Sequence, residues 1–388
     1  MRRSSSSGPP KRHNHECETG CTKTPLCLNT LWILLAFYCI LSRCNMFHKS
    51  MKNLTPRERT RHALNRKPVD RLPTQINFTP PMAQQLAAHF QVSIEQLQEV
   101  LGNHLLRLDI GHPARVSDDG KTSYDWWGAG WSTESEGYVH TVAPMRSRIS
   151  PEEFPWPNPA EKTLLDQAIA RMAADKGRHF VVPNLGMCLF ERAWSLRGFE
   201  SFLMDMGESP EWVEDILDRI TEIQLVLVHR FIASGVDGGY FGDDYGAQQS
   251  LLFSARMWRR YMKPRLARLF APFREAGLPV ILHSDGDIQL ILPDLVEIGV
   301  TTLNPVQPEV LDHERLYREF GDRLSFYGGI STQSVLPRGT AAEIRAATER
   351  CIRTLAPHGT GLLLGPSHRM QTDIPIENIE IMLRSFPS

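Results

Sequence analysis

A histidine and an aspartate two residues apart, His283 and Asp285, directly follow a short apolar run and precede a glycine. The run, Pro279–Leu282, is apolar throughout, which is typical of a strand buried on both faces in a parallel sheet. Alternate residues of an extended chain point to the same side, so both side chains can reach one atom. A core histidine satisfied by a neighbour is the competing interpretation, and the carboxylate and glycine at a predicted strand end make a binding role equally favoured.

Polar residues stand directly after the other predicted strands as well. At the carboxyl ends of strands in α/β folds, such residues are typical of ligand-binding sites. Two acids in tandem, Asp243 and Asp244, equally fit a helix N-cap beside a solvated neighbour, and an arginine there equally fits a surface ion pair. The catalytic candidates are Asp109, Asp243, Asp244 and His368, and the substrate-binding candidates are Arg192, Tyr327, Gly328, Gly329, Arg369 and Gln371.

A metal centre formed by His283, Asp285 and His368 is a more specific hypothesis than separate roles for these residues. Two imidazoles and a carboxylate are a sufficient ligand set for zinc or another divalent ion, with one coordination position left open for catalysis. One of the tandem acids would add a fourth oxygen or orient a histidine. The alternative needs no metal: His368 would donate a proton and Asp109 would anchor a ligand in a buried pocket.

Short apolar runs alternate with amphipathic stretches from residue 70 onward, as βα units require. Eight such units predict an α/β fold, a single TIM barrel. The strands are expected at Leu72–Phe78, His104–Ile110, His179–Asn184, Val236–Phe241, Pro279–His283, Thr301–Pro305, Leu324–Gly328 and Gly361–Leu364. The helices are expected at Ser209–Ser234, Ala255–Ala276, Ile288–Gly299, Asp312–Phe320, Ala341–Leu355 and Ile376–Arg384.

An aromatic and glycine-rich segment, Tyr124–Val142, interrupts this alternation after the second predicted strand. It predicts an inserted hairpin. Its tryptophans would either cap the barrel mouth over a flat ligand or pack on one another in a surface hairpin.

The first 50 residues differ in composition from the rest of the chain. Residues 1–12 are basic and serine-rich, which is typical of disorder, and residues 26–41 are mostly apolar but short for a spanning helix. We expect a mis-assigned start, with the natural start at Met51; a signal or membrane anchor and a structured extension are the alternatives. The expected division is therefore a leader of residues 1–50 and a barrel of residues 51–388, with membrane contact only if the leader is genuine.

The net charge limits the expected binding partners, and the positions of the cysteines indicate the cellular compartment. The net charge is −1 and no basic patch stands out, so we expect no nucleic-acid partner. Only Cys188 and Cys351 lie beyond residue 50, so the body is not a disulfide scaffold and suits the reducing cytoplasm. Anchoring in a membrane or export through residues 26–41 is the alternative.

The motifs, in their order along the chain, resemble those of the uroporphyrinogen decarboxylase family, which includes the cobamide-dependent methyltransferases. The resemblance runs from about Thr55 to the C-terminus. It rests on Gly242-Asp243-Asp244, His283-Ser284-Asp285-Gly286, Phe326-Tyr327-Gly328-Gly329-Ile330, Gly365-Pro366-Ser367-His368 and Pro375-Ile376-Glu377-Asn378-Ile379. It implies a single TIM barrel, the fold that the alternation of strands and helices predicts independently.

The two branches of this family imply different chemistry. Decarboxylases carry an Arg-Gln-Ala-Gly-Arg segment after the first strand, which grips porphyrinogen carboxylates, whereas this chain has Asn77–Met82 there, without an arginine. The methyltransferases bind zinc through a His-x-Cys pair and a later cysteine. At those positions the chain has His283, Asp285 and His368, so it resembles the methyltransferase branch more closely, with a harder ligand set.

The resemblance implies metal-assisted methyl transfer from a corrinoid to a small acceptor, with a divalent ion, zinc first, as cofactor and a corrinoid protein as partner. Two alternatives stay open. One is cofactor-free decarboxylation of uroporphyrinogen, in which Asp109 grips pyrrole N–H groups and His368 transfers a proton. The other is a barrel that binds a tetrapyrrole or another small molecule without catalysis.

Overall fold

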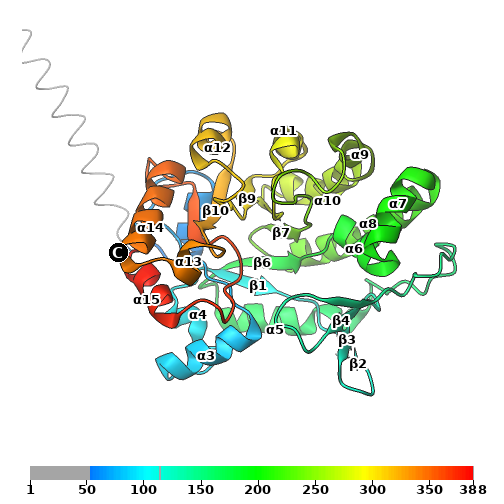
Figure 1. Ribbon diagram of the computed structural model, residues 1–388, viewed down its shortest axis with the longest axis horizontal. Helices are drawn as coiled ribbons and strands as arrows, with labels where there is room; N and C mark the ends of the chain where they lie inside the picture. The colour runs from blue at the N-terminus through cyan, green and yellow to red at the C-terminus, as the bar shows by residue number, and fades with distance from the viewer. Residues whose placement is uncertain (1–52, 113–114, 388) are drawn as a thin grey trace, which may run out of the picture. The chain divides into compact units, whose positions relative to one another are not determined.

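Parallel strands form the central sheet of the protein. A computed structural model describes residues 53–112 and 115–387, so the predicted leader lies outside the described residues. Seven strands pair in parallel in the order β1-β6-β7-β8-β9-β10-β11, and the sheet curls so that helices cover its outer face (Figure 1). The strands are β1 (Leu105–Leu108), β6 (Phe180–Leu185), β7 (Gly239–Gly242), β8 (Val280–His283), β9 (Thr302–Asn304), β10 (Ser325–Ile330) and β11 (Leu362–Pro366).

The first predicted strand, Leu72–Phe78, is not a regular strand, so the prediction of eight strands is wrong by one in the described residues. Thr74 instead forms single parallel bridges to Asn103, beside β1, and to Leu364 of β11. Side chains replace part of the ladder here, because the backbone N–H groups of His104 and Leu105 donate to the amide oxygen of Gln75. The segment therefore runs between the two edge strands with few backbone pairs.

Helices connect the strands at most of the predicted positions. The predicted bounds of α14 and α15 are confirmed, and a capping box of Thr340 and Glu343 begins α14. The single helix predicted at Ala255–Ala276 is two helices, and Pro264, which has no backbone N–H to continue the first, lies at the start of the second. The helices are α2 (Pro56–Leu64), α3 (Pro80–Phe90), α4 (Leu97–Val100), α5 (Asp166–Asp175), α6 (Phe190–Arg197), α7 (Phe199–Glu208), α8 (Pro210–Ala233), α9 (Ala255–Tyr261), α10 (Lys263–Glu275), α11 (Leu292–Ile298), α12 (His313–Phe320), α13 (Val335–Arg338), α14 (Ala341–Leu355) and α15 (Ile376–Arg384), with 3-10 turns at Lys162–Leu165 and Gln289–Ile291.

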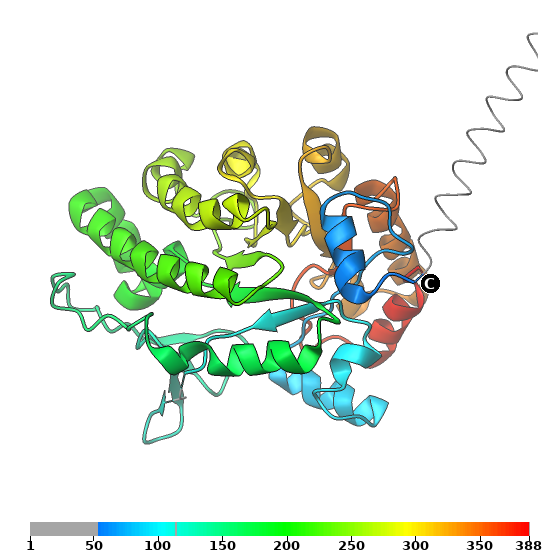
Figure 2. The ribbon, with the colours of Figure 1, turned by 180° about the vertical axis from the view of Figure 1, so that it is seen from behind.

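The concave face of the sheet encloses a small inner core. One strand residue in two points into it, as the pleat requires. Helix α2 (blue in Figure 2) supplies Leu64 to this core. The inner core comprises Leu64, Leu105, Phe180, Val182, Tyr240, Ile281, Tyr327 and Leu363. Residues two positions further along the strands, such as His283 after Ile281, therefore also point inward, toward the carboxyl ends.

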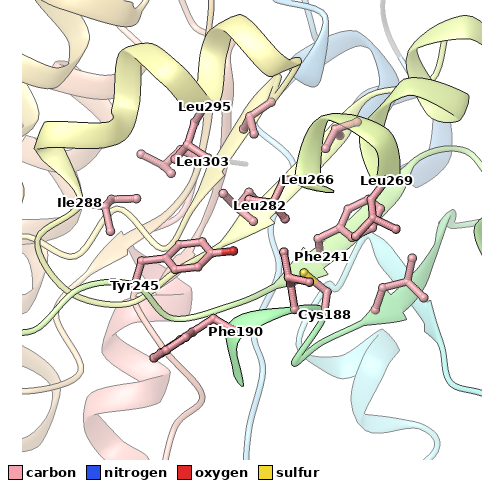
Figure 3. Close-up of a cluster of buried hydrophobic side chains, with 14 of the residues drawn as sticks. Cys188, Phe190, Phe241, Tyr245, Leu266, Leu269, Leu282, Ile288, Leu295 and Leu303 are labelled. Carbon is pink, nitrogen blue, oxygen red and sulfur yellow. The ribbon is translucent and has the colours of Figure 1, made fainter. Parts of the chain in front are cut away.

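The outer core lies between the sheet and its helices. Figure 3 shows Phe241, Leu282 and Leu303, from β7, β8 and β9, within one apolar cluster. Their helical neighbours in the same view are Leu266, Leu269 and Leu295. Burial of these apolar side chains on both faces fixes the strands whose ends carry the polar candidates.

A second, antiparallel sheet spans residues 115–142, so it begins before the segment Tyr124–Val142 in which a hairpin was predicted. Its strands pair in the order β2-β3-β4-β5. The indole ring of Trp127 contacts those of Trp126 and Trp156, and Trp131 contacts His140 and Trp194 of α6. These contacts favour packing of the tryptophans on the protein itself over a cap for a flat ligand. The strands are β2 (Arg115–Val116), β3 (Thr122–Tyr124), β4 (Gly130–Ser132) and β5 (His140–Val142).

Within the described part of the chain, no helix has both the length and the apolar character needed to cross a bilayer. Cys188 and Cys351 are both buried and free. Burial raises the pKa of the Cys351 thiol to about 12, so this residue packs as a small apolar side chain.

Candidate metal centre

His283 is the last residue of β8 and lies between two neighbouring strands. In the sheet register it pairs with Gly242 of β7 and with Asn304 of β9. Its imidazole Nδ1 lies 2.7 Å from Oδ1 of Asn304. An amide oxygen only accepts, so Nδ1 carries the proton in this hydrogen bond and Nε2 keeps its lone pair. Asn304 therefore fixes the histidine in the tautomer that a metal ligand requires.

Asp285 and His368 face the same Nε2 atom. The Nε2 of His283 lies 3.8 Å from Oδ1 of Asp285, and the Nε2 of His368 lies 3.3 Å from Oδ2 of Asp285. The three candidate ligand atoms all lie within 4.8 Å of one another. Around a tetrahedral zinc, with ligand distances of about 2.0–2.1 Å, neighbouring ligand atoms lie about 3.4 Å apart. Small side-chain shifts therefore bring this set to zinc geometry, and its partial exposure leaves room for a fourth ligand.

Asp244 lies beside this cluster and positions it. Its Oδ1 accepts a hydrogen bond of 2.8 Å from the backbone N–H of Asp285 and lies 3.9 Å from Nε2 of His283. Burial raises the pKa of the Asp244 carboxyl above its usual value, against the opposing attraction of His283. This acid can add an oxygen ligand or hold a proton next to the ligand set.

The neighbouring acid, Asp243, faces away from the cluster. Its carboxylate is fully buried and accepts hydrogen bonds from the backbone N–H groups of Phe190 and Glu191, at the start of α6, and from the hydroxyl of Tyr245. Burial raises its pKa to about 6. In the described structure Asp243 therefore caps a helix 53 residues away in sequence, and its catalytic role stays a prediction.

Glu191 is an acid of this region that sequence reasoning missed. Burial, and then repulsion from Asp244 and Asp243, hold the pKa of the Glu191 carboxyl well above its usual value. The shift favours the protonated form of Glu191 next to the two neighbouring acids. Its position at the start of a helix after β6 was the available signal, but an acid in a first helical turn is ordinarily a dipole partner.

A comparison with known protein families identifies the family of this chain. A family model described as uroporphyrinogen decarboxylase (URO-D) matches residues 183–386, more than half of the chain. The chain belongs to the uroporphyrinogen decarboxylase family. The matched segment contains His283, Asp285 and His368, and also the tandem acids Asp243 and Asp244.

The fold of this family member is similar to that of a methyltransferase from Methanosarcina mazei, over 86% of this chain and 98% of that chain, at 19% identity and a TM-score of 0.62. A sugar phosphate isomerase/epimerase from Parabacteroides distasonis ATCC 8503 matches over 80% of this chain and 92% of that chain, at 10% identity and a TM-score of 0.35, which is too low to support an argument. No curated protein matches this chain in sequence.

Several predicted substrate-binding residues of this uroporphyrinogen decarboxylase family member have partners within the fold. Arg192 forms an ion pair with Asp125 and lies over the ring of Trp127, so it joins α6 to the antiparallel sheet. Tyr327 lies in the inner core, and its hydroxyl accepts from Asn77. A Cβ on Gly329 would lie 2.6 Å from the sulfur of Cys351, so the absence of a side chain here lets α14 pack close to β10. Gly328 instead faces Asn304.

Two other predicted residues, Arg369 and Gln371, line a cavity of about 410 Å³ together with Asp285 and His368. Arg369 lies over the ring of Tyr138, with 4.5 Å between its Cζ and the ring centre. The buried Nε2 of Gln307 lacks a hydrogen-bond partner in the described structure, and this side chain lines the same cavity. An unpartnered buried donor is costly, so an acceptor group from water or from a ligand is expected here.

Asp109 lies at the carboxyl end of β1, as predicted, and is exposed. Its Oδ1 accepts a hydrogen bond of 2.7 Å from the amide of Asn184. His368 is paired with Asp285. The two residues that the decarboxylase mechanism would use thus belong to separate hydrogen-bonded groups.

Proposed function

We propose that the protein is a metal-assisted methyltransferase that moves a methyl group from a corrinoid to a small acceptor. The observation that carries this proposal is the convergence of His283, Asp285 and His368, with His283 already in its ligand tautomer through Asn304. Family membership and the fold shared with a methyltransferase support it at a coarser level. A corrinoid protein is the corresponding macromolecular partner.

The residues present fit a divalent ion, and zinc is the first candidate, held by His283, Asp285 and His368. When bound, such an ion lowers the pKa of a coordinated thiol or hydroxyl acceptor. Asn304 holds the imidazole, and Asp244 holds the Asp285 backbone in place. Asp244 is also the nearest acid of raised pKa that can take up the proton released by the acceptor.

We further propose that the barrel is residues 51–388, closed by the 72–78 segment between β1 and β11, with residues 1–50 as a separate leader. The bridges of Thr74 to both edge strands support this closure. The two free, buried cysteines fit the reducing cytoplasm as its compartment. Porphyrinogen decarboxylation is the less favoured activity, because no arginine lies at 77–82 and His368 pairs with Asp285.

Metal analysis of the purified full-length protein tests the proposal. We expect one divalent ion per chain, with loss of the ion in His283→Ala and His368→Ala. The matched control is His89→Ala, because His89 is an exposed histidine paired with Glu380 on the outer surface. Transfer of a methyl group from methylcobalamin to a thiol acceptor, followed by the loss of its absorbance, would then depend on the same two histidines.

Two outcomes would overturn the proposal. One is a protein without a stoichiometric ion whose ligand binding is unchanged in His283→Ala. The other is release of CO₂ from uroporphyrinogen by the metal-free protein, which would establish the decarboxylase activity instead.

A further inference from the structure

Arg107 on β1 is an arginine inside the curled sheet, and sequence reasoning did not single it out. Leu105, two residues earlier on the strand, belongs to the inner core, so Arg107 points to the same side. Its Cζ lies 4.0 Å from the centre of the Tyr240 ring, another residue of that core. The guanidinium is therefore at the carboxyl-end layer of the inner core, where a strand interior ordinarily carries an apolar residue.

The charge of Arg107 has no carboxylate partner. Its Nη2 donates a hydrogen bond of 2.6 Å to the amide oxygen of Asn184, whose amide group in turn donates to Asp109. Within the described residues, no carboxylate oxygen lies within 4.0 Å of this guanidinium, although fourteen other arginine side chains have one. A guanidinium cannot lose its proton, so its charge remains in this partly buried position.

Tyr240 connects Arg107 to the metal centre. Its hydroxyl donates a hydrogen bond of 2.9 Å to Oδ1 of Asn304, the same oxygen that holds His283. The rings of Tyr240 and His283 have centres 6.3 Å apart. Since the guanidinium carbon lies 4.0 Å from the Tyr240 ring centre, it lies no more than about 10 Å from the His283 ring centre. This separation is within the length of a small molecule.

We propose that Arg107 is a specificity-determining residue that binds the carboxylate of a small acid, whose other end reaches the metal centre. This inference rests on the proposed function and adds the chemical class of the acceptor. The planar fork of a guanidinium matches a carboxylate with two parallel hydrogen bonds. Asp109 shares Asn184 with Arg107, and Asp244 and Asp285 lie near His283, so a singly charged carboxylate is favoured over a doubly charged phosphate.

The test is calorimetric binding of a matched acid and amide, 3-mercaptopropionate and 3-mercaptopropionamide, to the zinc-loaded full-length protein. We expect tighter binding of the acid by about 10- to 100-fold, the range of a charge-assisted hydrogen bond. Arg107→Met should remove this preference and leave the affinity for the amide unchanged. Arg107→Lys keeps the positive charge but lacks the planar guanidinium, so it should retain part of the preference for the acid.

Arg115→Met is the control, because Arg115 also stacks on a tyrosine, with its Cζ 4.1 Å from the Tyr124 ring centre, but is exposed on β2. It should leave the preference for the acid intact. If Arg107→Met does not fold, Arg107→Gln supplies a neutral side chain that still donates to Asn184. The inference is overturned if the wild type binds acid and amide equally, or if a folded neutral variant at 107 keeps the preference.

Repeating the titration with His283→Ala separates this inference from the proposed function. Loss of metal in that variant with retention of the acid preference supports Arg107 independently of the ion. A wild-type protein that binds no zinc but prefers the acid through Arg107 would overturn the metal centre alone.

Discussion

The imidazole Nδ1 of His283 and the amide Oδ1 of Asn304 are 2.7 Å apart, between the ends of adjacent strands. The hydroxyl of Tyr240 donates to the same oxygen, and the amide group of Asn304 donates to the backbone carbonyl of Tyr327. The orientation of Asn304 is thus fixed from both sides. This single side chain determines which nitrogen of His283 faces the acids and the second histidine.

Removing this hydrogen bond should weaken metal binding. Asn304→Ala is expected to lower zinc affinity by about 10- to 100-fold, the usual effect of losing a partner that orients a histidine ligand. Competition with a chelating dye measures it. Thr302→Val is the matched control, because Thr302 is buried on the same strand and its hydroxyl has no partner. Equal zinc affinity in Asn304→Ala and the wild type would contradict the role of Asn304.

Changing the carboxylate ligand to a thiolate should change which ion is preferred. Asp285→Cys is expected to favour soft Cd²⁺ over hard Mn²⁺ relative to the wild type, because thiolates select softer ions. Competition between the two ions, followed by metal analysis, gives the ratio. Asp373→Cys places a thiol in the same cavity outside the ligand cluster and should leave the ratio unchanged. An unaltered ratio in Asp285→Cys would remove Asp285 from the ligand set.

The buried His104 should make stability depend on pH. Burial, with added repulsion from Arg59 and Arg71, lowers its pKa to about 4 in the folded protein, against about 6.5 when unfolded. The unfolded chain therefore binds the proton first as the pH falls. This contribution to the free energy of unfolding is complete above pH 6.5 and is lost between about pH 6.5 and 4, by about 3 kcal/mol.

Urea unfolding of the wild type and His104→Gln between pH 4 and 7 measures this contribution. The difference between the two free energies of unfolding should shrink as the pH falls through this window. The pKa of Asp243 is raised to about 6, so this residue makes the free energy of unfolding change with pH in the opposite direction. Asp243 is present in both proteins, so its effect cancels in the difference between them. A difference that stays constant from pH 7 to 4 would contradict the prediction.

Glu191 should cost stability at neutral pH. Its pKa is raised by burial and by Asp244 and Asp243, so the folded protein retains a proton that the unfolded chain releases. The free energy of unfolding therefore falls as the pH rises above the unfolded value, near 4.5. Glu191→Gln, which mimics the protonated acid, is expected to be more stable than the wild type, increasingly so from pH 5 to pH 8.

Urea unfolding at these two pH values tests the Glu191 prediction. Glu200→Gln, at an exposed position in the first turn of α7, should change the free energy of unfolding by no more than about 0.5 kcal/mol. A Glu191→Gln protein that is less stable than the wild type at pH 8 would show that the ionised carboxylate stabilises the fold.

Much of the fold followed from local pattern. Helices α14 and α15 were predictable to the residue, because the capping box of α14, the proline before α15 and the apolar spacing of both are local to each segment. The 72–78 segment was not, because the side chains of Gln75 and Asn103 replace backbone pairs in a way that no periodicity records. The break before α10 was missed although Pro264 was visible, since a proline near a helix start and one inside a helix look alike locally.

The sequence by itself determined which polar residues stand at strand ends, including His283, Asp285 and His368, because burial on both faces marks each strand in its own short run of residues. Only the tertiary structure decided which of them meet. It turned Asp243 toward α6 and left Asp244 beside His283. It also placed Arg107 over Tyr240, with no carboxylate oxygen of the described residues within 4.0 Å. These relationships depend on the lateral register of strands far apart in the chain, and sequence spacing contains no information about that register.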